Sequence, residues 1–127
     1  MADLMTLDGL QYYFDPAAVT AVADHDPDTL HAVTTVSGLT NGRLRLAEKP
    51  EAFLARIGAT QWFARFTQMT DTFVWINCTA VAVLRAAGPD EHPDAQAVVV
   101  AGSQTFVVKE SLLRARQMIN TQGGGRL

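Results

Sequence analysis

Residues 14–22, FDPAAVTAV, and residues 76–84, INCTAVAVL, share one pattern: a hydrophobic residue, then Asp or Asn, then apolar residues at matching positions. Ile76 follows Phe14 by 62 residues (76 − 14). A fixed spacing of this kind identifies an internal repeat, which decides the fold before any single motif does. The same spacing relates four further pairs, which are Pro27 and Pro89, Leu44 and Phe106, Glu48 and Glu110, and Ile57 and Ile119.

The first copy predicts several short strands followed by a short helix. Asp8-Gly9 is typical of a two-residue hairpin turn, and Asn41-Gly42 predicts a second tight turn. Pro50 suits the first position of a helix, which Gly58 ends. The strands that we expect in this copy are residues 4–7, 10–14, 18–23, 30–36 and 43–46.

The second copy predicts the same order of elements. Ser111 is a good N-cap for a helix with an apolar stripe. The apolar run 80–84 predicts a central strand that is covered on both faces, with Val81 and Leu84 buried. Thr34-Thr35 in the first copy predicts a more exposed strand. The strands that we expect in the second copy are residues 66–69, 72–77, 79–85, 95–101 and 105–108.

We therefore expect a mainly β (α+β) fold in which two tandem strand-rich repeats, each ending in a short helix, pack as one pseudo-twofold domain. A repeat of this size buries too little surface to be stable alone, so the two copies should share one core. The repeats span about 4–58 and 66–120 within a single domain, 1–122, with a junction at 59–65 and a flexible tail at 123–127.

Composition limits the function classes. The chain has 48% hydrophobic residues and a net charge of −3, which excludes a disordered chain and argues against a broad electrostatic grip on nucleic acid. It holds no apolar run of about 18 residues, so we expect no membrane span. Residues 1–10 lack the pattern of a signal peptide and Cys78 is the single cysteine, so we expect a cytoplasmic protein.

Residues 107–111, VVKES, precede a predicted amphipathic helix and follow a Gly-containing hairpin. This stretch resembles the FlbD/SwrD-like family of short bacterial flagellar proteins, whose single-copy chains look like one of the two halves. The resemblance covers residues 73–119 better than 10–57. It implies an accessory role linked to motility, without a catalytic site.

Two predicted hairpin loops combine carboxylates with imidazole, a set that can hold a divalent metal. Asp and Pro also favour turns, so we expect solvated loops and no metal or other cofactor. Cys78 with His31 or His92 could pair a thiol with a base, but we expect a buried cysteine instead. The candidate metal ligands are His25, Asp28, His92 and Asp94.

Two other groups are candidate contact residues. Trp62 and Phe63 are adjacent, so an extended backbone would expose one of them as an anchor for a protein partner. Lys109, Arg114 and Arg116, with Arg126 in the tail, make the C-terminal end locally basic, which suits nucleic-acid phosphates or the carbonyl end of the last helix.

These patterns favour a non-enzymatic bacterial protein-interaction or assembly module, linked to motility or to a mobile element. Unpaired sheet edges with little lysine to protect them predict a homodimer or larger oligomer, alongside an unknown protein partner. The alternatives are a small nucleic-acid-binding regulator and, third, a metal-dependent enzyme.

Overall fold

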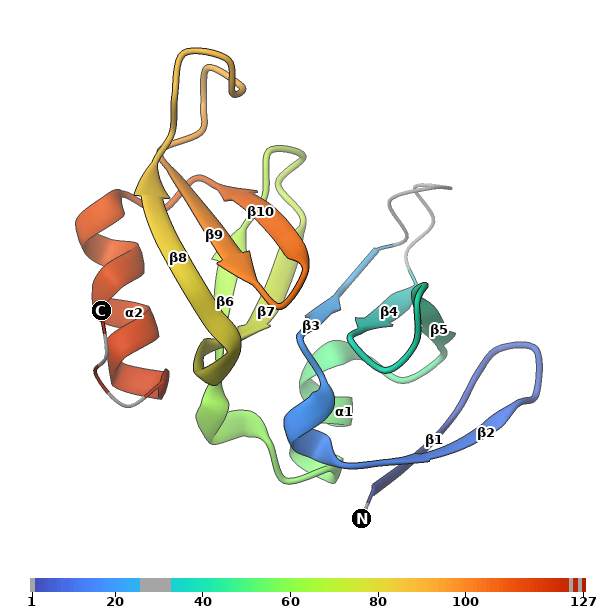
Figure 1. Ribbon diagram of the computed structural model, residues 1–127. Coiled ribbons are helices and arrows are strands. Elements are labelled where there is room, and N and C mark those ends of the chain that lie inside the picture. Colours follow the sequence, from blue (N-terminus) through green and yellow to red (C-terminus); the bar gives the residue numbers. More distant parts are fainter. Residues whose placement is uncertain (1, 26–32, 124, 126) are drawn as a thin grey trace. The chain divides into compact units, whose positions relative to one another are not determined.

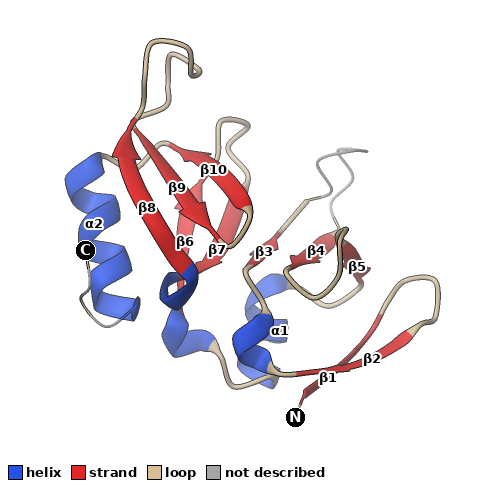
Figure 2. Cartoon of the chain, viewed as in Figure 1, coloured by secondary structure: helices blue, strands red, loops and turns tan. Residues whose placement is uncertain are grey.

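The computed structural model describes residues 2–25, 33–123, 125 and 127, and it divides into two compact units, Met1–Gln61 and Trp62–Leu127. Strands dominate both units, and each unit carries one α-helix after its last strand (Figures 1 and 2). The fold is therefore mainly β of the α+β class, as the sequence predicts.

The first unit combines a two-stranded hairpin, β1–β2, with three antiparallel strands in the order β3–β4–β5. Phe14 stacks against Phe53 of the helix, with ring centroids 6.1 Å apart. The hairpin is thereby anchored to the helix. Its elements are β1 (Ala2–Met5), β2 (Gln11–Phe14), the 3-10 helix η1 (Pro16–Ala18), β3 (Ala21–Ala23), β4 (Thr34–Ser37), β5 (Leu44–Leu46) and α1 (Pro50–Arg56).

The second unit combines the hairpin β6–β7 with an antiparallel sheet in the order β10–β9–β8. A bridge between Gln68 and Val108 joins the hairpin to β10. The helix α2 lies beside β8 (Figure 1). The elements are η2 (Thr60–Trp62), which ends at the first residue of this unit, β6 (Phe63–Thr67), β7 (Phe73–Asn77), η3 (Cys78–Ala80), β8 (Val81–Ala86), β9 (Ala97–Ala101), β10 (Gln104–Val108) and α2 (Leu112–Gly123).

Local details recur 62 residues apart. The side chain of Asp15 accepts a hydrogen bond from the second residue after it, and Asn77 does the same at the start of η3. Gly9 and Asp71 both adopt positive φ angles, of 89° and 60°, in the turns of the two hairpins. These features agree with the repeated sequence. The pseudo-twofold relation and the shared core stay predictions.

The central strand of each three-stranded array is the most buried. All four residues of β4 are buried, and Val98 and Val99 of β9 are fully so. The prediction that Thr34 and Thr35 are exposed is therefore wrong. The hydroxyl of Thr35 donates to the main-chain oxygen of His25 at 3.0 Å, which removes the cost of burying it.

The prediction that Val81 and Leu84 are buried is also wrong. Both are only half-buried, and Val83 between them is 46% exposed. The physical reason is that β8 is the edge strand of its sheet, so its apolar run is not covered on both faces. The matching residues of the first unit, Val19 and Val22, are fully buried.

Several strands begin or end at other residues than expected. The first hairpin turn is longer than two residues, because Met5 pairs with Gln11 and the Thr6 N–H donates to the Leu10 oxygen at 2.9 Å. The strand expected at 18–23 begins only at Ala21, after η1. The strand expected at 66–69 begins earlier, at Phe63.

Two side chains near the ends of α2 bind β6. Both carboxylate oxygens of Glu110 accept from the Thr67 N–H, at 2.9 and 3.2 Å, and one also accepts from the Thr67 hydroxyl at 2.9 Å. Gln122 donates to the main-chain oxygen of Phe63 at 3.0 Å. A Cβ atom on Gly123 would lie 2.6 Å from the main-chain oxygen of Cys78, so only glycine permits this approach.

Candidate functional site

The β1–β2 hairpin exposes more large apolar side chains than any other described element. Strand alternation explains two of them, because Leu4 and Phe14 point into the core while their neighbours Met5 and Tyr13 point outward. The exposed set, which we call the hairpin patch, consists of Met5 (57% exposed), Leu7 (54%), Leu10 (53%) and Tyr13 (73%).

The turn of this hairpin is held in place by polar contacts. The Thr6 hydroxyl donates to the carboxylate of Asp8 and accepts from the Leu10 N–H at 3.0 Å. The Leu7 N–H donates to the main-chain oxygen of Arg45 at 2.9 Å. The turn is thus joined to β5, and Leu7 and Leu10 are presented on an ordered backbone.

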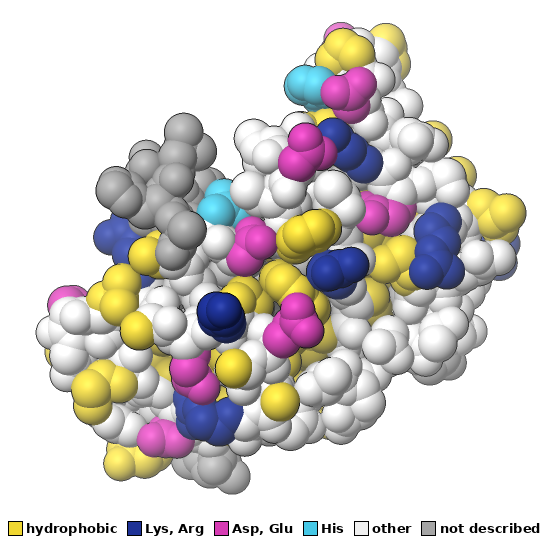
Figure 3. Space-filling view, turned by 180° about the vertical axis from the view of Figure 1, so that it is seen from behind, with side chains coloured by type: hydrophobic (Ala, Val, Ile, Leu, Met, Phe, Trp, Pro, Cys, Tyr) yellow, Lys and Arg dark blue, Asp and Glu magenta, His cyan; other side chains and the backbone are white. Residues whose placement is uncertain are grey.

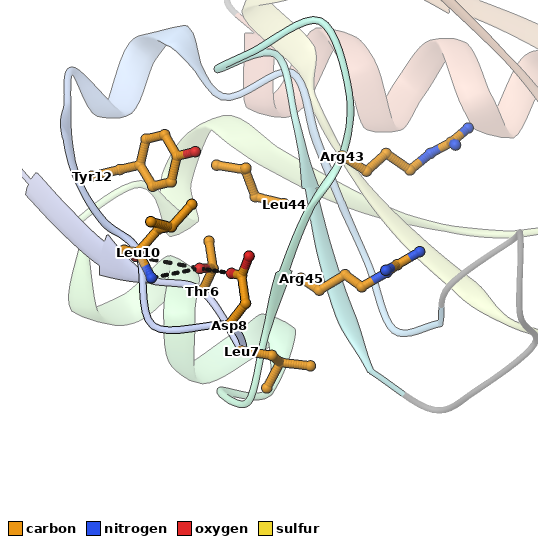
Figure 4. Close-up of a pocket in the computed structure, with 8 residues that line it drawn as sticks. All are labelled: Thr6, Leu7, Asp8, Leu10, Tyr12, Arg43, Leu44 and Arg45. Atoms are coloured by element: carbon orange, nitrogen blue, oxygen red, sulfur yellow. Dashed lines mark hydrogen bonds between the residues drawn. The ribbon is translucent and has the colours of Figure 1, made fainter.

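A pocket of about 330 Å³ lies between this turn and β5. Figure 4 shows Leu10 and Tyr12 on one side and Leu44 pointing toward Tyr12 from β5, whereas Arg43 and Arg45 point away to the opposite side of that strand. We call it the hairpin pocket. Its lining consists of Thr6, Leu7, Asp8, Leu10, Tyr12, Arg43, Leu44 and Arg45.

Sequence reasoning missed this site, although a signal was available. Residues 10–14 read LQYYF, so aromatic side chains fall on both faces of one short strand. In a two-stranded hairpin only one face can pack on the core. An apolar residue on the second face therefore predicts a contact surface, and Tyr13 is the residue that this argument selects.

Of the two predicted anchor residues, the structure buries Phe63 and leaves Trp62 half-buried. Phe63 is only 3% exposed and belongs to the core of its unit, so it offers no contact surface. Trp62 ends η2 and is half-buried. A contact role for Trp62 stays a prediction.

The three described basic residues at the C-terminal end, Lys109 before α2 and Arg114 and Arg116 within it, have different surroundings, and Arg126 lies outside the described residues. Lys109 donates to Asp71 at 2.6 Å, and this hydrogen bond raises the pKa of the ammonium group. Arg116 donates to the main-chain oxygen of Leu127 at 3.0 Å. Arg114 is exposed. Figure 3 shows acidic and basic side chains interspersed over the described part of one face, an arrangement that favours local contacts over a broad grip on phosphates.

The described residues of the two loops with carboxylate and imidazole side chains are exposed or half-buried. His92 Nδ1 accepts from the Asp94 N–H at 3.0 Å, and the Asp24 carboxylate lies 3.4 Å from His25 Nδ1. Within the residues that the structure describes, no three His, Cys, Asp or Glu side chains form a group suited to a metal ion. Asp28 and His31 lie outside the described residues.

Cys78 is buried, at 3% exposure, and its thiol donates to the main-chain oxygen of Ile76 at 3.6 Å. Burial raises the pKa of this thiol to about 12. At neutral pH the sulfur is therefore protonated, and a protonated thiol is a poor nucleophile. The cysteine packs as a small hydrophobic residue, as the sequence suggests.

The residues of the VVKES stretch have structural partners in the second unit. Lys109 binds Asp71, Glu110 binds Thr67, and the Ser111 hydroxyl accepts from the Arg114 N–H at 3.1 Å, as an N-cap does. The motif therefore fixes the passage from β10 into α2.

Comparison with protein-family models, curated proteins and solved structures gives no match to this chain. The resemblance to the FlbD/SwrD-like family stays a prediction from residues 107–111. No helix in the part of the chain that the structure describes is long and apolar enough to cross a membrane.

Proposed function

We propose that this chain is a non-enzymatic assembly module that associates with a protein partner, in the first instance another copy of itself, through the β1–β2 hairpin. The observation that carries the proposal is the hairpin patch. Among the exposed large hydrophobic side chains of the described residues, Met5, Leu7, Leu10 and Tyr13 all belong to this one hairpin. Several large apolar side chains exposed on one element are typical of a protein contact site.

The backbone of the hairpin supports the same proposal. β1 and β2 form a sheet of two strands, so each strand has one edge outside that pair. Such edges invite pairing with another chain unless charges or proline protect them. Residues 2–14 contain no lysine and no proline, and the one charged residue within β1 and β2, Asp3, is paired with Arg56. The resemblance at residues 107–111 adds a motility-linked setting, which swimming assays of a bacterium lacking the gene would test.

Light scattering with size-exclusion chromatography tests the proposed association. We expect a mass above that of the 13.7 kDa chain at micromolar concentrations, and we expect Tyr13→Ser and Leu10→Ser to lower it toward the monomer. Val83→Ser is the matched control, because Val83 is also exposed but lies on β8. A monomeric parent chain, or equal effects of all three substitutions, would contradict the proposal.

A further inference from the structure

The loop that joins β4 to β5 (Figure 1) carries an exposed asparagine, Asn41, followed directly by exposed Gly42. Among the described residues, no side chain or main-chain group forms a hydrogen bond with the Asn41 side chain. A Cβ atom built on Gly42 would meet no atom within 4 Å, so the space beside this glycine is open. The Asn41 amide is therefore unrestrained, and its neighbour leaves room for the backbone to turn.

The main-chain nitrogen that follows an asparagine can attack the side-chain amide carbon, Cγ, which closes a five-membered ring. Glycine hinders this attack least, because it has no Cβ and permits the backbone rotation that the ring requires. The Gly42 N–H donates to the hydroxyl of exposed Thr40 at 3.2 Å. This distance is at the long end of the range for such bonds, so the nitrogen is held only weakly.

The other two asparagines of the chain are held by their surroundings. Asn77 is fully buried, and its Oδ1 accepts from the N–H and the hydroxyl of Thr79, at 3.0 and 2.6 Å. The Asn120 side chain donates to the main-chain oxygen of Leu127 at 3.0 Å and accepts from its N–H at 2.9 Å. These contacts oppose the side-chain rotation that ring closure needs, so the structure singles out Asn41.

We propose that Asn41 is a site of spontaneous deamidation in the folded protein. The Gly42 nitrogen bonds to Cγ of Asn41, the bond from Cγ to the side-chain nitrogen breaks, and that nitrogen leaves as ammonia with the Gly42 amide proton. A water molecule then opens the ring at either carbonyl carbon, which gives aspartate or isoaspartate. Either product adds one negative charge to the net charge of −3, two residues before Arg43 of the hairpin pocket. The reaction is independent of the proposed association.

Incubation of the full chain in heavy-oxygen water, followed by proteolysis and tandem mass spectrometry, tests the proposal. The product should carry the heavy isotope at residue 41, and it should form faster at mildly alkaline than at mildly acidic pH, because the attacking nitrogen must lose its proton. The same chain unfolded in urea gives the reference rate for each asparagine. Folding should slow the reaction at Asn77 and Asn120 about tenfold or more, since both need local opening, but at Asn41 by less than about threefold.

Substitutions in the loop test the assigned roles, with circular dichroism to show that each variant folds. Gly42→Ala should slow the reaction at Asn41 about tenfold or more, because the added methyl group restricts the backbone. Thr40→Ala should speed it about twofold or more, because the Gly42 N–H loses its acceptor. Thr70→Ala, at an exposed position elsewhere, should leave the rate unchanged.

Two results would overturn the proposal. One is an Asn41 that stays intact in the folded chain under conditions that convert it in the unfolded chain. The other is an equal rate in the parent and in folded Gly42→Ala. Because the first comparison uses the parent chain alone, it stands even where a variant fails to fold.

Discussion

Glu110→Ala removes the acceptor of the contact between β6 and the start of α2. The carboxylate accepts from both the N–H and the hydroxyl of Thr67, and the bonded groups are partly buried. A hydrogen bond to a charged group contributes about 1.5–3 kcal/mol, and a donor left without a partner adds a desolvation cost. We expect the substitution to lower the free energy of unfolding by about 2 kcal/mol.

The equivalent residue of the first copy supplies the control. Glu48 accepts from Arg56 at 2.8 and 2.9 Å, but this pair is exposed. Exposed ion pairs contribute about 0–1 kcal/mol, so Glu48→Ala should cost about 0.5 kcal/mol. The same Glu→Ala substitution at corresponding positions of the repeat should therefore lower the free energy of unfolding by two different amounts.

Urea denaturation followed by circular dichroism measures both costs, and the slope of the transition should stay the same. The denaturation midpoint of Glu110→Gln should lie between those of the parent and Glu110→Ala, because the amide keeps one acceptor oxygen but no charge. Equal midpoints for Glu48→Ala and Glu110→Ala, or a larger loss for Glu48→Ala, would refute the assignment of the buried contact to Glu110.

Three further predictions follow from packing and ionisation. Gly123→Ala should lower the melting temperature because the new methyl group meets the main chain of Cys78, whereas Gly42→Ala, with no atom within 4 Å of its added Cβ, should not. Burial raises the pKa of the Cys78 thiol from 9.0 to about 12. The unfolded chain therefore loses this proton first, and the stability of the parent relative to Cys78→Ala, measured by urea titration, should fall as the pH rises from about 9 to about 12. In thermal or urea melts, Val22→Ala should cost about 2 kcal/mol and half-buried Leu84→Ala less; the reverse order would contradict the assigned burial.

Local sequence signals predicted the order of the elements well because they depend on neighbouring residues. Turn residues, strand alternation and the Ser111 cap act over a few positions and need no tertiary contact. Burial was harder to predict. The run 80–84 reads as a central strand, but only the strand order shows that β8 has no neighbour on one side of its sheet. The sequence predicts that Thr34 and Thr35 are exposed, because it does not show the main-chain oxygen of His25 that accepts from the Thr35 hydroxyl.

The candidate site was unpredicted for a related reason. The hairpin pocket depends on Leu44 approaching Tyr12 from β5, a contact between residues far apart in the chain. The exposure of Tyr13 depends on which face of the hairpin meets α1. Alternation limits the choice to two faces, and only the folded unit selects one.

The attachment of α2 to β6 has a consequence for local opening. Glu110 and Gln122 hold Thr67 and Phe63, residues 43 and 59 positions away, so the two ends of the strand are fastened to the two ends of the helix. If either end of α2 moves away from β6, one of these two side-chain hydrogen bonds must break. In native-state hydrogen exchange, the amides of α2 and β6 should therefore exchange with similar free energies, as one cooperative opening unit rather than as a fraying helix beside a stable strand.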